Sequence, residues 1–343
     1  MPVAVYPWHQ RQWQEILQRK AALPHALLFK GREGIGKLDF VRKLAQSLAC
    51  ESPAADGAGC GTCQSCRWFA AGNHPDCREM LPEAMRPAGV EKAIADGRKP
   101  RQEIIVDDVR DLEVFINLIA NHRNGKTIVV YPAEALNVNA ANALLKNLEE
   151  PPPSTRFMLV AHRPSYLPAT IISRCQQVVL PTPPAAIAER WLGEQGMAEP
   201  ALSLAQTGNA PLAALALDDA EFWTQRKALL GGLAASRVDP LALAEQIGEF
   251  PLGRLLGCLQ RWTYDLLSAK STGRVRYNPD FETALTRIAA SLRAADIARF
   301  LRALVHQQRS VNHPLNPRLF IEQLLLSYAA LLRGEDLAGV HAG

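Results

Sequence analysis

Residues 26–37 read ALLFKGREGIGK, and this stretch decides the fold. The apolar run Ala26–Lys30 is typical of a short buried strand, and residues 31–37 fit the phosphate-loop pattern of glycines ending in lysine. The next residues place apolar side chains on one stripe at helical spacing, at Leu38, Val41, Leu44 and Leu48. A strand, a glycine-rich loop and a helix in this order predict an α/β domain whose loop N–H groups can approach a phosphate.

Further strands and helices follow along the first 180 residues. Three more short apolar runs predict strands, at residues 127–131 (TIVVY), 156–161 (RFMLVA) and 177–180 (QVVL). Residues 107–121, with Asp107 as the capping residue, and residues 139–150, which three prolines end, have helical patterns. Apolar strands that alternate with helices predict a parallel sheet covered on both faces.

The sequence changes character after the prolines at 181–184. From there to about residue 333, Leu and Ala recur at helical spacing without a strand pattern, with a break near residues 208–219. We therefore predict an α/β domain at residues 1–180, a small helical part at 181–213, a larger helical domain at 214–333 and a flexible tail at 334–343.

Composition limits the class of protein. The 343 residues are 48% hydrophobic and carry 38 basic and 34 acidic side chains, a net charge of +4. This balance excludes a histone-like polycation and an acidic tail, but it allows a local basic patch. No segment approaches the about 18 consecutive apolar residues of a membrane span. The N-terminus lacks the basic and apolar regions of a signal peptide, so we expect a cytoplasmic protein without a membrane partner.

The predicted phosphate loop lacks the groups that handle a metal ion. Gly31, Gly34, Gly36 and Lys37 are the candidate nucleotide-binding residues. Leu38 follows the lysine where Ser or Thr would hold Mg²⁺, and the strand TIVV ends in Tyr131-Pro132 where an ATPase needs an Asp. These departures argue against ATP hydrolysis, and whether the loop still binds ATP or ADP stays open.

Residues 139–176 carry a resemblance to a known family. The run NAANALLKNLEEPPPSTRFMLVAHRPSYLPATIISRCQ is similar to the segment shared by bacterial clamp-loader subunits of the AAA+ class. The resemblance extends from Tyr6-Pro7-Trp8 to Asn316-Pro317-Arg318-Leu319, so it covers nearly the whole chain. It implies an AAA+-type P-loop domain, then an all-α lid and an all-α collar domain through which subunits assemble.

The departures indicate which kind of subunit this chain resembles. Motor subunits (tau/gamma) would keep Ser or Thr after the lysine and an acidic pair at the strand end. They would also carry a hydroxyl side chain at the sensor-1 position and an arginine at the sensor-2 position, which fall here at Ala161-His162 and near Leu212. What survives is Ser173-Arg174-Cys175. The resemblance implies a catalytically silent subunit that lends Arg174 as an arginine finger to a neighbouring ATPase, because a guanidinium supplied in trans stabilises the charge of the transferred phosphoryl group.

The same resemblance implies the partners and the process. They are the tau/gamma motor subunits and a delta subunit, with the sliding clamp and primed DNA met through the complex. The chain would then be a subunit without intrinsic activity in a DNA polymerase III holoenzyme, supporting ATP-driven clamp loading during DNA replication. Two alternatives are an active AAA+ NTPase motor, favoured by Lys37 and its glycines, and a zinc-dependent DNA-binding protein, favoured by a cysteine cluster.

That cluster is Cys50, Cys60, Cys63 and Cys66, in the pattern C-x9-C-x2-C-x2-C. Four thiolates at this spacing fit a tetrahedral structural Zn²⁺ site, although the dense pattern also resembles iron–sulfur ligation. Cys77 is an alternative fourth ligand, and the family resemblance favours Cys50. We therefore expect a zinc module inserted at about residues 50–77. A closed shell of four thiolates leaves no position for a catalytic water.

Three other polar groups are more simply explained without a site. His74 follows the cysteines but fits a turn, and the Glu149-Glu150 pair fits the end of a helix before Pro151. The basic run at residues 98–101 (RKPR) fits a solvated loop better than a nucleic-acid contact. Aromatic residues make up only 6% of the chain and are not interleaved with basic ones, so direct DNA recognition has weak support.

Overall fold

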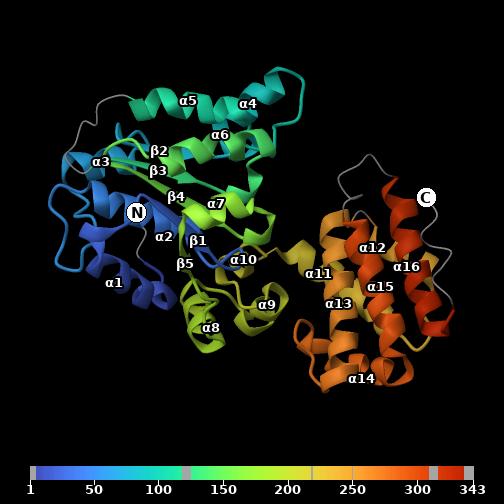
Figure 1. Cartoon of the computed structure of the whole chain (residues 1–343). Coiled ribbons are helices and arrows are strands. Elements are labelled where there is room, and N and C mark those ends of the chain that lie inside the picture. Colours follow the sequence, from blue (N-terminus) through green and yellow to red (C-terminus); the bar gives the residue numbers. More distant parts are fainter. Residues whose placement is uncertain (1–4, 118–124, 218, 249, 309–315, 336–343) are drawn as a thin grey trace. The chain divides into compact units, whose positions relative to one another are not determined.

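The computed structural model describes residues 5–117, 125–217, 219–248, 250–308 and 316–335. The chain divides into two compact units, residues 1–187 and 188–343, and each is described by itself (Figure 1). The predicted tail at 334–343 lies almost wholly outside the described residues, as do residues 118–121 of the helix expected at 107–121. None of the described helices is long and apolar enough to cross a membrane.

The first unit is built on a five-stranded parallel sheet in the order β2-β3-β4-β1-β5. Its strands are β1 (Ala26–Lys30), β2 (Cys77–Met80), β3 (Lys126–Val130), β4 (Thr155–Ala161) and β5 (Gln176–Val179). The central strands β1, β3 and β4 are almost fully buried because helices cover both faces, which explains their continuous apolar runs.

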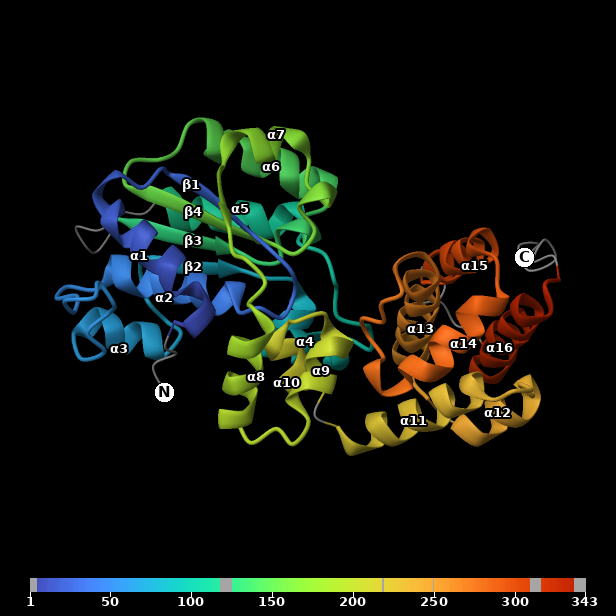
Figure 2. The same ribbon diagram turned by 90° about the horizontal axis from the view of Figure 1, so that it is seen from below.

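Two groups of helices cover the sheet (Figures 1 and 2). On one face, apolar side chains of α5 (Val106–Asn117), α6 (Val138–Glu149) and α7 (Ala169–Arg174) share a core with Leu28 and Phe157. On the other face lie α1 (Gln10–Gln18) and α2 (Lys37–Ala49), where Phe40 contacts Phe29 and Trp13. The remaining elements of this unit are α3 (Gln64–Ala70), α4 (Pro87–Ala95) and the short 3-10 helices η1 (Pro7–His9), η2 (Lys20–Ala22), η3 (Glu83–Met85), η4 (Ala133–Ala135) and η5 (Pro164–Tyr166).

The structure corrects the predicted elements at several points. Strand β2 was not predicted, because its sequence CREM carries two charged residues at the edge of the sheet. Asp107 does not cap the helix at 107–121: it lies inside the first turn of α5, while Asp108 accepts a hydrogen bond from the N–H of Ile105. Helix α6 begins one residue earlier than predicted because Asn137 caps it by accepting from the N–H of Ala140.

All described elements that begin after residue 180 are helices. Helices α8 (Ala185–Glu194), α9 (Pro200–Thr207) and α10 (Pro211–Ala216) pack around Leu192 and Leu204. A larger core, centred on buried Trp262 and Tyr328, joins the remaining helices. These are α11 (Ala220–Ala234), α12 (Pro240–Ile247), α13 (Leu252–Thr272), η6 (Pro279–Phe281), α14 (Glu282–Ser291), α15 (Ala294–Gln307) and α16 (Pro317–Arg333). Cys258 is buried in this core.

A buried polar network connects the small and large helical groups of the second unit. Asn278 donates to the carboxylate of Asp265, and its side-chain oxygen accepts from Gln206 at 3.0 Å and from Arg226 at 2.9 Å. Gln206 belongs to α9, whereas Arg226 and Asp265 belong to α11 and α13. These hydrogen bonds join three helices through one buried amide, although Gln206 Oε1 and Arg226 Nε have no partner among the described residues.

Candidate functional site

The phosphate-loop residues follow β1 and lead directly into α2. Gly34 and Gly36 have φ angles of 77° and 86°, a left-handed backbone conformation that glycine adopts readily. Gly31 passes so close to Leu180 that a Cβ at this position would collide with the Leu180 carbonyl oxygen. The glycines therefore serve the loop conformation itself, whether or not the loop binds a phosphate.

The lysine of this loop is engaged by the protein. Lys37 is 2% exposed, and its Nζ donates to the carbonyl oxygen of Arg32 at 2.6 Å and lies 2.6 Å from Nδ1 of His162. Burial lowers the pKa of Lys37 to about 8, against the opposing charges of Glu134 and Glu33. A protonated Lys37 donates to a neutral imidazole here, because burial and the charge of Lys37 also lower the pKa of His162.

His162 connects the loop to the end of β3. Its Nε2 lies 3.1 Å from the hydroxyl of Tyr131, the residue that stands where an ATPase needs an Asp. Glu134 lies three residues beyond Tyr131, and its Oε1 accepts from the backbone N–H groups of His162 at 2.9 Å and Arg163 at 3.0 Å. Lys37, His162 and Tyr131 thus form a connected series of hydrogen bonds at the place where a Mg²⁺ ion would require carboxylate and hydroxyl oxygens.

Aromatic side chains of the N-terminal segment pack against the same loop. The Trp8 indole N–H donates to the carbonyl oxygen of Ile35 at 2.9 Å, and the rings of Tyr6 and Trp8 stack 4.9 Å apart. His9 is fully buried beside Phe40, and neither of its ring nitrogens has a hydrogen-bond partner among the described residues. Burial and the charge of Lys37 lower the pKa of His9 to about 4, so the ring is neutral near pH 7.

Arg174 is the last residue of α7 and is half-buried. Its Nη1 donates to the carbonyl oxygen of Thr170 at 3.0 Å, and its Nη2 forms an ion pair with Glu149, the last residue of α6. Ser173 is exposed, and its hydroxyl donates to the carbonyl oxygen of Thr170 at 3.0 Å. Cys175 is buried and packs into the core under α7. The motif therefore anchors a short helix through its cysteine and places the arginine at the helix end. The pairing of Glu149 with Arg174 was not predicted from the sequence.

The four clustered cysteines come together in space. The Sγ atoms of Cys50, Cys60, Cys63 and Cys66 all lie within 4.8 Å of one another, and those of Cys50 and Cys63 are 3.9 Å apart. Four sulfurs at about 2.3 Å from a central Zn²⁺ ion would be separated by about 3.8 Å, so this donor set fits a tetrahedral zinc site. Cys50 ends α2 and Cys63 caps α3, which shows how the two helices position the sulfurs.

Backbone N–H groups around the cluster point at sulfur. Cys60 donates its N–H to Cys50 at 3.3 Å, Cys63 to Cys60 at 3.3 Å, and Cys66 to Cys63 at 3.4 Å. The N–H groups of Thr62 and Cys63 lower the pKa of Cys60 to about 5, whereas burial raises the pKa of Cys66 to about 12. The N–H groups favour the thiolate form. Because burial raises the pKa of the buried Cys50 and Cys66 thiols, these two need a nearby cation to become thiolates.

Cys77 and His74 lie outside this cluster. Cys77 begins β2 and pairs with Thr127 in the sheet, so the inserted segment ends before it. His74 is buried, with Nε2 2.8 Å from the Ser65 hydroxyl and Nδ1 accepting from the N–H of Asp76 at 3.0 Å. Both of its ring nitrogens are thus engaged, which agrees with a role in the turn.

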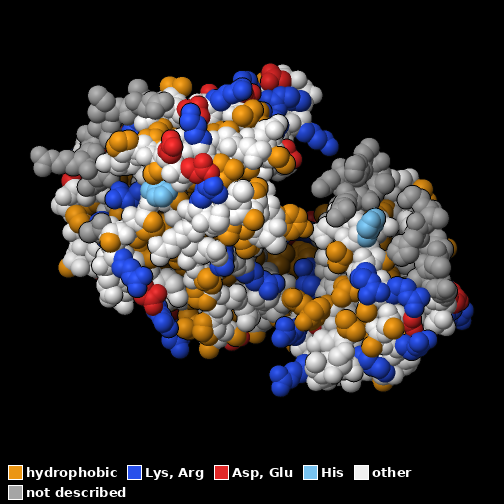
Figure 3. All heavy atoms as spheres, in the orientation of Figure 1, with side chains coloured by type: hydrophobic (Ala, Val, Ile, Leu, Met, Phe, Trp, Pro, Cys, Tyr) orange, Lys and Arg blue, Asp and Glu red, His pale blue; other side chains and the backbone are white. Residues whose placement is uncertain are grey.

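The basic run at 98–101 is a loop whose three cationic residues are exposed, and two of them also contact a buried carboxylate. Arg98 forms two hydrogen bonds to the carboxylate of Glu83, at 2.6 and 2.7 Å, and the N–H of Arg101 donates to the same carboxylate at 3.0 Å. Glu83 is 5% exposed, and the Arg101 guanidinium also lies 3.4 Å from its carboxylate, so two of the three cations of this run neutralise a buried charge. On the face drawn in Figure 3, basic side chains of the α/β unit are mixed with acidic and apolar ones.

The sheet, the phosphate loop after β1 and the helical regions that follow are those of the AAA+-type P-loop fold class predicted from the sequence. The sequence pattern of the family described as "DNA polymerase III, delta subunit" matches residues 8–184, and that of "DNA polymerase III, delta subunit, C terminal" matches residues 220–329. The first match alone spans more than half of the chain.

Individual relatives narrow the assignment. The chain is 36% identical over 338 residues to the DNA polymerase III subunit delta' of Pseudomonas aeruginosa, covering 95% of this chain and 98% of that one. It is 33% identical to the subunit of the same name from Yersinia pestis, covering 96% and 97%. The DNA polymerase III subunit tau of Escherichia coli is 34% identical over 153 residues, covering 45% of this chain and 21% of that one. The chain therefore belongs to the DNA polymerase III delta-prime family.

Proposed function

We propose that this chain is a non-catalytic subunit of a bacterial clamp loader, working in the cytoplasm and supporting ATP-driven loading of the sliding clamp onto primed DNA. One observation carries the proposal: the phosphate-loop lysine is bound by the chain itself. Lys37 is buried against His162 and Arg32, and Leu38 supplies no metal ligand. Because the lysine that would contact a nucleotide phosphate is hydrogen-bonded within the chain, the loop is poorly suited to ATP hydrolysis, and a non-catalytic role within an assembly fits it better.

The arginine at the end of α7 gives this subunit a role in catalysis by a neighbour. Arg174 ends α7 half-exposed, and one exposed ion pair to Glu149 is weak enough to exchange for a phosphate. A guanidinium offers paired donors to phosphate oxygens, and a finger supplied in trans accelerates phosphoryl transfer by about 10³- to 10⁵-fold in well-studied nucleotide hydrolases. Arg174 would complete the ATP site of an adjacent tau/gamma motor subunit, with a delta subunit elsewhere in the assembly.

The cysteine cluster serves the fold of the subunit. Cys50, Cys60, Cys63 and Cys66 would hold one structural Zn²⁺ that ties the end of α2 to α3. The sulfur positions and the N–H groups directed at them support this site. Four thiolates leave no open position for water, so the metal contributes folding free energy and no chemistry.

The experiment compares three ATPase assays, on this chain alone, on a motor subunit of the same source alone, and on the two together. We expect no turnover by this chain alone and a higher rate for the mixture than for the motor subunit. Lys37→Ala in this chain should leave the rate of the mixture unchanged. Turnover by this chain alone that Lys37→Ala abolishes would establish an active NTPase and contradict the proposal.

A further inference from the structure

Strand β5 forms one edge of the sheet, with unpaired main-chain groups on its outer side. It pairs only with β1 among the described strands, with Gln177 opposite Leu28 and Val179 opposite Lys30. The N–H of Leu180 donates to the carbonyl oxygen of Lys30 at 2.9 Å, so Val178 and Leu180 turn their main-chain groups toward β1. Because alternate residues of a strand face opposite sides, the N–H and C=O groups of Gln177 and Val179 face away from the sheet.

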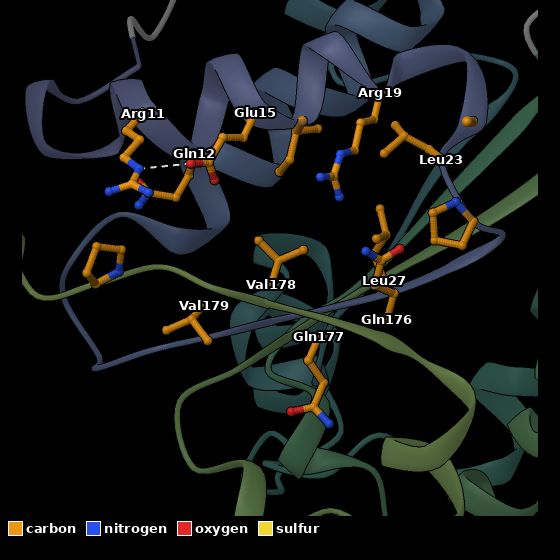
Figure 4. A pocket seen from close by; sticks show the side chains of 14 residues that line it. Arg11, Gln12, Glu15, Arg19, Leu23, Leu27, Gln176, Gln177, Val178 and Val179 are labelled. Carbon is orange, nitrogen blue, oxygen red and sulfur yellow. Dashed lines mark hydrogen bonds and ion pairs between the residues drawn. The ribbon is translucent and has the colours of Figure 1, made fainter.

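A cavity of about 700 Å³ runs between this edge and helix α1. Apolar side chains line it from both sides: Leu27 and Val178 from the sheet (Figure 4), and Ile16 from α1. Leu27 and Ile16 are buried. Val179 is 57% exposed on the edge itself. An extended chain laid along the edge would direct every second side chain to the face that carries the cavity, since side chains alternate along a strand.

The helix above the cavity carries one uncompensated positive charge. Arg11 and Glu15 pair with each other at 2.8 Å, so they offset one another. Arg19 makes no ion pair within the described part of the chain, and Figure 4 shows its side chain reaching from α1 into the space above Leu27 and Val178. An unpaired guanidinium binds a carboxylate or a phosphate through charge-assisted hydrogen bonds, and the carboxylate is the one that an unmodified peptide carries.

We propose that the outer edge of β5 is a docking site for an extended, acidic peptide segment of a partner protein. The segment adds a strand to the sheet by pairing with the main chain of Gln177 and Val179. It places apolar side chains in the cavity above Leu27 and a carboxylate against Arg19. Main-chain pairing supplies affinity in such strand addition, and the pockets for alternate side chains supply specificity. The site uses neither the phosphate loop nor Arg174. Peptide binding at β5 can therefore be tested independently of the function proposed above.

The test uses a fluorescein-labelled hexapeptide, Val-Thr-Val-Thr-Glu-Thr, whose valines and glutamate lie on the same face of a strand. It is titrated into the full-length chain and followed by fluorescence anisotropy. Two probes control for its features: the same peptide with lysine in place of glutamate, and the same peptide with alternate backbone nitrogens methylated. We expect saturable binding of the acidic peptide and binding at least about tenfold weaker for each control, since one lost charge-assisted or main-chain hydrogen bond is worth about that factor.

Variants of the chain locate the contact. Val179→Pro removes one outward N–H without touching the pairing to β1, and Arg19→Glu reverses the charge over the cavity. Each should weaken binding of the acidic peptide about tenfold or more, whereas Arg237→Glu, at an exposed position in the other unit, should not. Circular dichroism checks the fold of Val179→Pro, and Arg19→Glu tests the same site on a helix surface.

Four outcomes would overturn the proposal. They are no saturable binding of the acidic peptide, equal binding of the lysine or methylated peptide, and unchanged binding by both variants. The fourth is a dimer in sedimentation velocity that Val179→Pro dissociates, because the occupant of the edge would then be a second copy of this chain.

Discussion

Nζ of Lys37 and Nδ1 of His162 lie 2.6 Å apart, on the phosphate loop and at the end of β4. The distance means that the group which meets phosphate oxygens in a nucleotide-binding loop is here a donor to an internal base. His162 reaches the Tyr131 hydroxyl through its other ring nitrogen, so the former metal position is spanned by one connected set of side chains. Such a set stabilises the loop without a ligand.

Removing this base should weaken the fold. His162→Ala leaves the buried Lys37 ammonium with only the Arg32 carbonyl, and it leaves the Tyr131 hydroxyl without its imidazole partner. We expect a loss of about 1–3 kcal/mol in the free energy of unfolding, measured by urea denaturation at pH 7. His162→Asn keeps an acceptor near the position of Nδ1 and should lose less. Equal stability of wild type and His162→Ala would show that the contact contributes nothing.

His9 should make stability depend on pH. Burial and the charge of Lys37 lower its pKa to about 4 in the folded chain, from 6.5 for an ordinary histidine. As pH falls from 6.5 to 4, the unfolded chain binds a proton that the folded chain does not, so the free energy of unfolding falls. The size of the effect is about 3 kcal/mol across that window.

The check compares urea unfolding of wild type and His9→Phe at pH 7 and pH 5. His9→Phe keeps a ring beside Phe40 but cannot titrate, so it should lose less stability than wild type between the two pH values. Identical losses would mean that His9 is not the group responsible. His162 has a lowered pKa too and acts with the same sign, so some pH dependence should remain in the variant.

The cysteine cluster should bind one zinc ion per chain. Cys63→Ser should abolish the bound metal and lower the thermal midpoint, because the ion connects α2 to α3 and its binding free energy adds to folding. Cys77→Ser is the matched control and should retain the metal, since Cys77 lies in β2 outside the cluster. Elemental analysis of purified protein measures the content. A Cys77→Ser chain without metal, or a full metal content in Cys50→Ser, would contradict the assignment.

Glu149 should be dispensable for the proposed finger. Its ion pair with Arg174 involves side chains 48% and 34% exposed, so it is worth at most about 1 kcal/mol. Glu149→Gln should therefore leave the stability of the chain nearly unchanged. It should also not lower ATP turnover of the assembly with a motor subunit, because Arg174 has to leave Glu149 to reach a phosphate in trans. A drop in turnover as large as that of Arg174→Ala would show that the pair itself is required.

Much of the fold could be predicted from the sequence where local pattern and tertiary environment agree. Strand β1 has the predicted bounds, and β3, β4 and β5 lie within one residue of them, because buried parallel strands are continuous apolar runs. Strand β2 was not predicted because its sequence, CREM, carries charged residues that an edge strand tolerates. Helix α5 begins before the expected Asp107 cap, because Asp108 rather than Asp107 accepts a hydrogen bond from the N–H of Ile105.

The candidate site was predictable in its members but not in its contacts. The cysteine spacing indicated four sulfurs that lie together in the structure, and the phosphate-loop pattern indicated the loop that joins β1 to α2. Three contacts between distant segments could not be read from the sequence: His162 with Lys37, Glu149 with Arg174, and Glu83 with Arg98. Each joins residues at least 15 positions apart through the tertiary fold, and no spacing rule covers such pairs.

The central claim is that Arg174 acts on the ATP site of a neighbouring subunit, and one measurement tests it most directly. The ATP turnover of an assembly with a single ATP-competent motor subunit beside this chain is compared for wild type, Arg174→Ala and Arg110→Ala, an exposed arginine of α5. We expect co-purification in all three cases, a fall in turnover of about 10³-fold or more for Arg174→Ala, and no change for Arg110→Ala. Unchanged turnover by an intact assembly carrying Arg174→Ala would contradict it.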